Sequence, residues 1–331
     1  MTSALPLADS QRTSTFDFPI SRFRFELVAL DLVVMPRDNK GNVLRGAFGT
    51  IFKDLCCGLS CRKCFESPLR ESCAYAAIFE PSPSPGSDRL SGNQDIPRPF
   101  VFRPPTESKS RYEPGETFCF ELLLFGRAIQ YLAYFVVAFR ELAEKGFGIG
   151  RGRCRLQSIG VQKAEEGTWL PVYSVEDQCV RPEGPSVAAQ AAMAESSAAV
   201  SEITIEFQTP TELKHDGSVV RVPEFHHLVR RLRDRINAIG WFYGGVALDL
   251  DFAEFGRRAE SVTRVESDFR WSERDRLSTR THQRHSIGGF LGSARYQGEL
   301  TEFLPFLRLG EWTHVGKHAV WGNGQYRIVR P

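Results

Sequence analysis

The sequence predicts an α+β protein in which one order of strands and helices occurs twice. At 331 residues the chain is too long for a single ordinary core, so we expect two domains. In each half, runs with strand character and runs of helical period follow the order βαββαβ, the ferredoxin-like pattern. A stretch rich in Ala, Ser and Pro lies between the halves. We therefore expect an N-terminal ferredoxin-like domain over 1–180, a low-complexity linker over 181–200 and a C-terminal ferredoxin-like domain over 201–331.

The first copy opens with an apolar, β-branched run at 23–34 that is typical of a strand. Residues 41–55 follow, and Phe48 and Phe52 fall on one face of the helix that this segment predicts. A polar, cysteine-containing insertion then extends from 56 to about 97. The remaining elements expected in this copy are strands at 98–104 and 116–125, a helix at 127–145 and a strand at 153–163.

The second copy begins with a strand at 202–210 and continues with the clearest helix of the chain, 223–240. Pro223 suits the first turn of this helix and Gly240 suits its end. Its apolar residues recur at helical spacing and form one buried stripe. The elements expected after it are strands at 246–252, 265–271 and 288–300, a short helix at 302–312 and a closing strand at 325–329.

Composition and charge are those of an ordinary globular protein, with 42% apolar residues, 25% charged residues and a net charge of +2. This charge does not require a polyanionic partner, although arginine clusters can still form a local patch. The N-terminal residues lack the pattern of a signal peptide. The most apolar window, 120–139, is interrupted by Glu121, Arg127 and Gln130, so we expect no membrane span and a cytoplasmic protein.

Two glycine-rich loops occupy matching places, between the second helix and the last strand of each copy. The first covers 146–153 and contains Gly148, Gly150 and Arg151, and the second covers 316–324. Glycine permits positive φ and close backbone approach, and such loops with cations beside them bind phosphates. The alternative is that these glycines only make tight turns between helix and strand. The repetition of the loop with its cations favours a role in binding nucleic acid.

The C-terminal run GEWTHVGKHAVWGNGQYRI resembles the CRISPR repeat-processing endoribonucleases of the RAMP superfamily. Their signature loop, G-x5-G-x-G, is matched by Gly316, Gly322 and Gly324. The segments 276–284 and 288–300 are also similar to the C-terminal domain of this family, and 44–49 and 147–153 carry a weaker similarity in the first domain. The resemblance implies an endoribonuclease that needs no catalytic metal or other cofactor. It also implies two kinds of partner, CRISPR repeat RNA and subunits of a CRISPR effector complex.

The reaction implied is attack of the RNA's own 2′-OH on the adjacent phosphorus, which needs a general base, a general acid and a cation. The usual general base of the family is a histidine at the first helix, but this sequence has no histidine before His215. Lys40, Asn42 and Arg45 occupy that region. Three alternatives remain: electrostatic help from Lys or Arg there, acid–base work by histidines of the second domain, or RNA binding without cleavage.

The catalytic candidates are His314, Lys317 and His318 of the second glycine-rich loop, together with Arg45. Histidine suits acid or base work because its pKa lies near neutrality. The alternative for one of the two loop histidines is a structural hydrogen bond that holds the loop. For His226 and His227, in the first turn of a helix, a structural role is the favoured interpretation.

Four arginines are candidates for contacts with the RNA backbone, because no acidic residue lies between the first and the last of them. They are Arg276, Arg280, Arg284 and Arg295. The alternative is a solvated face whose charges are offset by acids nearby in the sequence.

Five cysteines lie close together in the insertion, which in a cytoplasmic protein favours a metal over disulfides. Four of them have spacers that suit a tetrahedral structural zinc, namely Cys57, Cys61, Cys64 and Cys73. Cys56 could replace Cys57. An iron–sulfur cluster and no metal at all are the alternatives.

Two functional classes follow, a repeat-specific endoribonuclease and a non-catalytic RNA-binding RAMP subunit of a CRISPR effector complex. The C-terminal resemblance favours the first, and the missing first-domain histidine favours the second. A metalloprotein unrelated to RNA is a more distant alternative.

Overall fold

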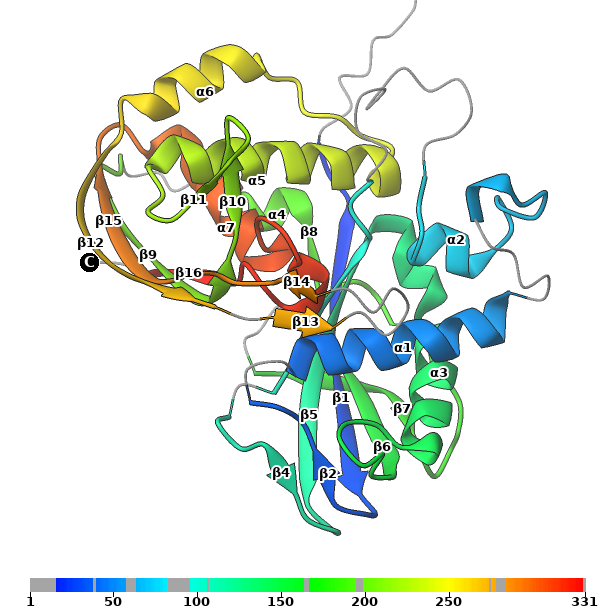
Figure 1. Cartoon of the computed structure of the whole chain (residues 1–331). Helices are drawn as coiled ribbons and strands as arrows, with labels where there is room; N and C mark the ends of the chain where they lie inside the picture. The colour runs from blue at the N-terminus through cyan, green and yellow to red at the C-terminus, as the bar shows by residue number, and fades with distance from the viewer. Residues whose placement is uncertain are drawn as a thin grey trace, which may run out of the picture.

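The computed structural model describes residues 16–37, 40–57, 64–82, 96–105, 107–163, 167–181, 183–194, 199–273, 275–277 and 284–329. It consists of two α+β domains, each built on an antiparallel sheet with helices packed against it (Figure 1). Within the described residues, no helix has both the length and the apolar character needed to cross a bilayer.

The first domain contains helices α1 and α3, which pack on a sheet of order β3-β5-β1-β6 with β7 added at the edge. The neighbouring strands of this sheet are all antiparallel. Two helices and four strands in this spatial order make a ferredoxin-like domain, so the prediction is confirmed. The elements are β1 (Pro19–Ala29), α1 (Lys40–Cys56), β3 (Phe100–Arg103), β5 (Thr117–Phe125), α3 (Leu132–Lys145), β6 (Cys154–Gln162) and β7 (Trp169–Ser174).

The second domain repeats this arrangement with a sheet of order β12-β15-β9-β16. Helix α5 packs against α7, and both belong to the layer that covers the sheet (Figure 1). The second ferredoxin-like prediction is therefore also confirmed. The elements are β9 (Glu202–Thr211), α5 (Phe225–Ile239), β12 (Thr263–Ser272), β15 (Gly289–Gln297), α7 (Leu304–Thr313) and β16 (Tyr326–Val329).

The strand predicted at 246–252 is wrong, because these residues are irregular and lead into helix α6 (Phe252–Glu260). Val246, Leu248 and Leu250 alternate as in a strand and pack on the core of the second domain. Their backbone does not join a sheet, and the N–H of Leu248 instead donates to the Asn237 side chain at 2.9 Å. The helix then begins at Asp251, whose carboxylate accepts from the first free N–H groups.

The expected linker 181–200 needs correction over residues 187–192. Strand β8 (Val187–Ala188) pairs with Pro19 and Ile20 of β1, and helix α4 (Ala189–Ala192) follows with Ala189 buried. Low complexity in this segment therefore does not mean an absence of structure, because residues 187–188 pair with the first residues of the central strand β1.

Short elements complete the chain. Three are two-stranded antiparallel sheets: β2 (Val33–Val34) with β4 (Arg111–Tyr112), β10 (Leu213–His215) with β11 (Ser218–Val220), and β13 (Asp275–Leu277) with β14 (Arg284–Ser286). The others are helix α2 (Ala74–Ile78), 3-10 turns at Cys64–Glu66, Gly126–Tyr131, Thr301–Phe303 and Ala319–Trp321, and a π-helical turn at Gly240–Gly244.

Two hydrophobic cores hold the domains, and the second core crosses the boundary between them. The first is rich in phenylalanine, with Phe48 stacked on Phe52 and Phe135. The second includes Val101 and Leu123 of the first sheet beside residues of the second domain. Burial of apolar surface across the boundary fixes the two domains relative to each other, and this fixed arrangement positions the cleft described next.

Candidate functional site

A cleft of about 500 Å³ lies where the start of helix α1 meets the second glycine-rich loop. Lys40, Gly41 and Asn42 line it from the first domain, and Trp321 and Asn323 line it from the loop. Two arginines also line it, Arg37 before α1 and Arg270 on β12, and neither has an ion-pair partner among the residues that the structure describes. The cleft therefore combines polar and cationic groups from both domains.

The glycines of the second loop allow it to fit tightly against the first domain. A Cβ on Gly322, where φ is 88°, would lie 2.7 Å from the carbonyl oxygen of Phe102. Across the contact, a Cβ on Gly41 would lie 1.8 Å from the carbonyl oxygen of Trp321. Real Cβ atoms are excluded from such positions, so glycine is required on both sides of the boundary.

Several N–H groups of this loop are already bonded within the chain. The N–H of Lys317 donates to Glu212 O at 3.0 Å, that of Gly322 to Ala319 O at 2.9 Å, and that of Gly324 to Pro210 O at 3.1 Å. These N–H groups cannot cradle a phosphate without losing a backbone hydrogen bond. RNA contact by Gly316, Gly322 and Gly324 stays a prediction, but close packing alone accounts for glycine at each: a Cβ on Gly316 would lie 2.4 Å from Glu212 O.

His314 is buried and bonded through both ring nitrogens. Its Nδ1 lies 3.1 Å from the carbonyl oxygen of Asn323, which can only accept, so Nδ1 carries the proton. Its Nε2 accepts from Nε of Arg103 at 2.9 Å. Burial, with Arg103 beside it, holds the pKa of His314 well below its usual range. This geometry favours the alternative of a structural histidine that ties the loop to β3, and the catalytic role of His314 stays a prediction.

His318 and Arg45 come together at Trp321. The imidazole of His318 stacks on the indole, with ring centroids 4.3 Å apart and an angle of 3° between the planes. The guanidinium of Arg45 lies 5.8 Å from the Trp321 ring and 4.3 Å from that of Phe79. Two predicted catalytic residues thus meet at a residue of the cleft wall. The sequence interpretation missed Trp321, although an aromatic residue inside the glycine signature is a readable signal.

Lys317 and Lys40 differ in how far their ammonium groups are exposed to solvent. Lys317 is half-exposed, and its Nζ pairs with Glu212 at 2.8 Å. Lys40 is buried, and its Nζ donates to Glu107 O at 2.8 Å and to the Tyr112 hydroxyl at 3.2 Å. Burial lowers the pKa of Lys40. Lys40 therefore holds the start of α1 in place, whereas the Lys317 ammonium remains accessible to solvent.

The first glycine-rich loop packs within its own domain. A Cβ on Gly148 would lie 2.3 Å from Val34 O, whereas nothing lies within 4 Å of one on Gly150. Arg151 is exposed, with φ at 54°. None of these three residues lines the cleft between the domains, so the structure does not bring the two predicted RNA-binding loops into one site.

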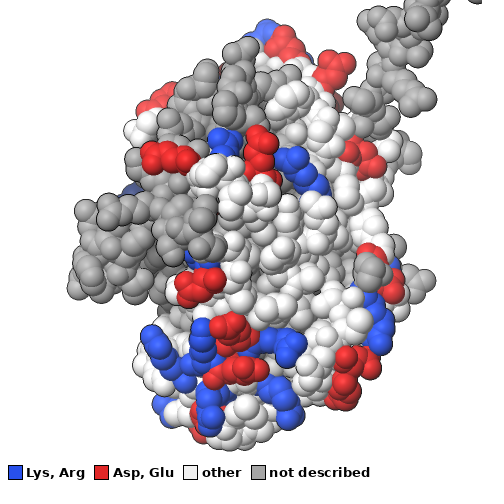
Figure 2. All heavy atoms as spheres, turned by 90° about the vertical axis from the view of Figure 1, so that its right-hand side faces the viewer, with Lys and Arg blue, Asp and Glu red and all other residues white. Residues whose placement is uncertain are grey.

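The predicted arginine patch is only partly visible. Arg280 lies outside the described residues, and for Arg276 and Arg284 only the backbone pairing of β13 with β14 is described. Arg295 forms ion pairs with Glu202 at 3.2 Å and Glu266 at 3.1 Å. Charges of both signs also mix on the face shown in Figure 2, with a broad uncharged area across its middle. In the lower part of that face, Lys and Arg side chains gather around a few acidic ones.

The predicted zinc site stays a prediction, because Cys61 lies outside the described residues. Cys64 is buried against the first core and Cys73 packs on it at the start of α2. Burial, with the thiols of Cys73 and Cys57 nearby, raises the pKa of Cys56 to about 12. Among the described cysteines, no three thiols lie within 4.8 Å of one another.

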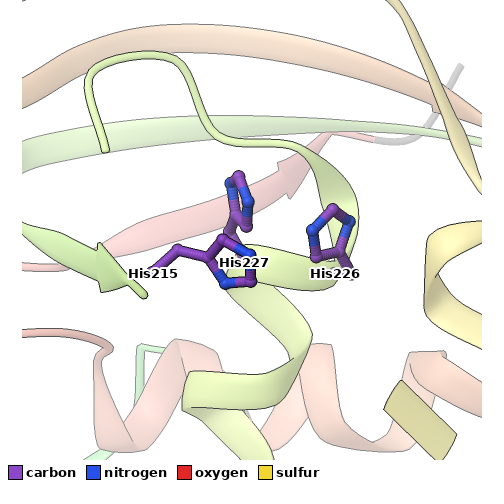
Figure 3. A group of neighbouring side chains, drawn as sticks. All are labelled: His215, His226 and His227. Carbon is purple, nitrogen blue, oxygen red and sulfur yellow. The ribbon is translucent and has the colours of Figure 1, made fainter. Parts of the chain in front are cut away.

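A second group of titratable side chains was missed by the sequence interpretation. His215, at the end of β10, meets His226 and His227 of the first turn of α5, and one ligand atom from each lies within 4.8 Å of the others (Figure 3). The readable signal was Asp216-Gly217, a dipeptide typical of a two-residue hairpin turn directly after His215.

Comparisons with known proteins agree with this fold. A family model for the CRISPR-associated endoribonuclease Cas6 matches residues 205–326, and a model described as an N-terminal domain matches residues 18–185. No curated protein matches the sequence significantly.

Among solved structures, a Cas6 product complex aligns with a TM-score of 0.57 at 16% identity, over 94% of this chain and 100% of that one. Cas6 of Thermus thermophilus aligns with a TM-score of 0.52 at 14% identity, over 94% and 99%. A partial Cas6-RT-Cas1–Cas2 complex aligns with a TM-score of 0.58 at 14% identity, over 95% of this chain and 46% of that one. At these identities the likeness is one of fold. Residues 205–326 are therefore a domain of the CRISPR-associated endoribonuclease Cas6 family, in a chain that shares its overall fold with Cas6 structures.

Proposed function

We propose that this protein binds precursor CRISPR RNA and cuts it within the repeats without a catalytic metal. The observation that carries the proposal is the cleft between the start of α1 and the second glycine-rich loop. His318 and Arg45 do not line this cleft, but both contact Trp321, which does. The match of residues 205–326 to the CRISPR-associated endoribonuclease Cas6 supports RNA cleavage as the reaction class.

In the proposed reaction the 2′-OH attacks the adjacent phosphorus, and the bond from phosphorus to the 5′-oxygen of the next nucleotide breaks. The 2′-OH gives its proton to a base and the leaving oxygen takes one from an acid, leaving a 2′,3′-cyclic phosphate and a 5′-OH. His318 performs one of these transfers and water in the cleft performs the other. Arg45, Lys317 and Arg270 stabilise the charge that develops on the phosphate.

The choice of His318 over His314 follows from their surroundings. His314 is fully buried and both its nitrogens are bonded, so it cannot exchange a proton with RNA unless those bonds break. His318 is half-buried and lies on Trp321 of the cleft wall. A base or acid must come within hydrogen-bond reach of the reacting oxygen, and of the two histidines only His318 has an accessible ring.

Repeat RNA is the proposed substrate, and subunits of a CRISPR complex are proposed partners. One solved neighbour is a Cas6-RT-Cas1–Cas2 assembly, which supports partners of this kind. We also propose a cytoplasmic location, where the transcript is made. The division of the chain into a first domain over 1–180 and a second over 201–331 is part of the same proposal, with the cleft at their boundary.

A second candidate function is RNA binding without cleavage, as a RAMP subunit of an effector complex. The specific observation in its favour is the absence of a histidine before His215, combined with the buried state of His314. A chain with one accessible loop histidine has fewer acid–base groups than the reaction can use.

The experiment is a cleavage assay in EDTA with repeat RNA, beside RNAs that carry one 2′-deoxy substitution at each candidate position. The proposal predicts one discrete cut that EDTA leaves unchanged and a single 2′-deoxy abolishes. The upstream product should end in a 2′,3′-cyclic phosphate. Tight RNA binding without any cut would support the second candidate, and failure to bind RNA at moderate salt would exclude both.

A further inference from the structure

Three histidines that are distant from the cleft wall converge in the second domain. His215 ends strand β10, and His226 and His227 lie in the first turn of α5, so a hairpin and a helix meet at their rings (Figure 3). The ring centroids of His215 and His227 are 4.4 Å apart, and those of His226 and His227 are 4.2 Å apart. Within the described parts of the chain this is the one group of three or more potential metal ligands with atoms within 4.8 Å.

The carboxylates around the group differ in their partners. Glu224 pairs with Arg264 at 2.7 Å and Glu260 pairs with Arg230, whereas Asp216 faces His215. A neutral imidazole offers a nitrogen lone pair, which is the form that binds a metal.

The hydrogen bonds of two rings decide which nitrogens are available. Nε2 of His215 faces Asp216 Oδ2 at 3.3 Å, so Nδ1 of His215 is left as the ligand atom. A carboxylate on the outer nitrogen is the usual orienting contact of a metal-bound histidine. Nδ1 of His227 accepts the N–H of Glu224 at 3.2 Å, which caps the helix. Ligation by His227 must therefore displace or rearrange this capping bond.

We propose that His215, His226 and His227 form a binding site for a divalent transition metal of the Zn²⁺ class. Three imidazoles supply three ligands, and the partly exposed rings leave a fourth position for water. Zn–N bonds of about 2.0–2.1 Å set the nitrogens of a tetrahedral site roughly 3.4 Å apart, so three nitrogens that lie within 4.8 Å of one another reach ligand distance by side-chain rotation. The site is separate from the cleft, because none of the three residues lines it.

The metal would fasten the β10–β11 hairpin to the start of α5. This hairpin begins directly after Glu212, which accepts the N–H of Lys317 and pairs with its side chain. The site therefore lies one short strand away from the contact that anchors the second glycine-rich loop. Its role is structural support for the loop and is independent of the chemistry proposed for the cleft.

The test is a metal titration of the full-length protein after treatment with chelator, with Co²⁺ as the spectroscopic probe and Zn²⁺ as its competitor. The expected result is visible Co²⁺ absorption of a nitrogen-ligated tetrahedral site, displaced by one equivalent of Zn²⁺. His226→Gln and His215→Gln should each weaken binding at least 10-fold, and Asp216→Asn should weaken it about 10-fold. His318→Gln, a histidine outside the group, is the matched control and should bind like the wild type.

Thiolate binding in the cysteine-rich insertion is distinguished by its intense near-ultraviolet charge-transfer absorption. Circular dichroism of each variant verifies folding, and Asp216→Asn changes an exposed side chain, so it keeps the test valid if a histidine variant misfolds. Unchanged Co²⁺ spectra and Zn²⁺ affinity in folded His226→Gln and Asp216→Asn would overturn the proposal. No activity is measured, so the outcome is independent of whether the protein cleaves RNA.

Discussion

The two glycine-rich loops occupy the same place in two copies of one fold, yet they have different surroundings. The first, between α3 and β6, packs on Val34 of its own domain and leaves Gly150 and Arg151 exposed. The second, between α7 and β16, is held between domains by close contacts at Gly41 and Gly322. Glycine permits positive φ in both loops. The two loops differ in what they pack against. The same sequence pattern therefore makes a turn within one domain in the first copy and a contact between the two domains in the second.

Alanine in the two loops should give the largest difference in stability, because the space around the two glycines differs. A Cβ on Gly324 would lie 1.8 Å from Val315 O with φ at 72°, whereas Gly150 has φ at 82° and nothing within 4 Å. Gly324→Ala should lower the free energy of unfolding by at least about 3 kcal/mol. Gly150→Ala should lower it by only about 1–2 kcal/mol, the cost of the left-handed backbone. Urea unfolding of both variants measures this difference, and equal losses would contradict it.

The boundary itself is tested on helix α1, where two glycines provide a matched pair. Gly41→Ala places a Cβ 1.8 Å from Trp321 O. Because this clash must be relieved, the substitution should lower the free energy of unfolding by about 2–3 kcal/mol or move the loop away and open the cleft. Gly46→Ala meets nothing within 4 Å and should stabilise the helix by about 0.5–1 kcal/mol. Thermal unfolding of the two proteins should therefore shift in opposite directions. If Gly41→Ala left the thermal stability unchanged, the second glycine-rich loop would not pack against this position.

The buried state of His314 predicts a pH dependence of stability. Its folded pKa lies below the unfolded value of about 6.5, so the unfolded chain binds the proton first. Stability is then unaffected above pH ~6.5 and falls by up to about 1.4 kcal/mol per pH unit below it. His227 adds to the slope, because its pKa is also lowered. His314→Gln should be less stable at pH 8 but should show a shallower slope between pH 6 and 5.

The smallest effect is expected at the exposed ion pair of the second loop. Lys317 pairs with Glu212 while half-exposed, so Lys317→Ala should change stability by about 0–1 kcal/mol. Because the ammonium is proposed to face RNA phosphates, binding should weaken and depend less steeply on salt. A stability loss above about 2 kcal/mol, with RNA binding unchanged, would reverse this interpretation.

Local periodicity and spacing were enough to predict both βαββαβ copies and the place of each glycine-rich loop. They failed at 246–252, where alternating apolar residues pack on the core without joining a sheet, and Asp251 starts a helix. The site was harder to predict, because it depends on contacts between domains. No sequence spacing indicates that Arg45 and His318 share Trp321, or that Arg103 donates a hydrogen bond to buried His314. The three-histidine group likewise forms only because the hairpin after β9 returns to α5.

The central claim is that His318, and not His314, transfers a proton in the cleft. Single-turnover cleavage of saturating repeat RNA by His318→Ala tests it most directly, with RNA affinity and unfolding measured on the same protein. We predict a rate about 10²–10⁴-fold below that of the wild type, with RNA affinity and stability little changed. A rate within a few-fold of the wild type, from a variant that still binds RNA, would contradict the assignment of His318.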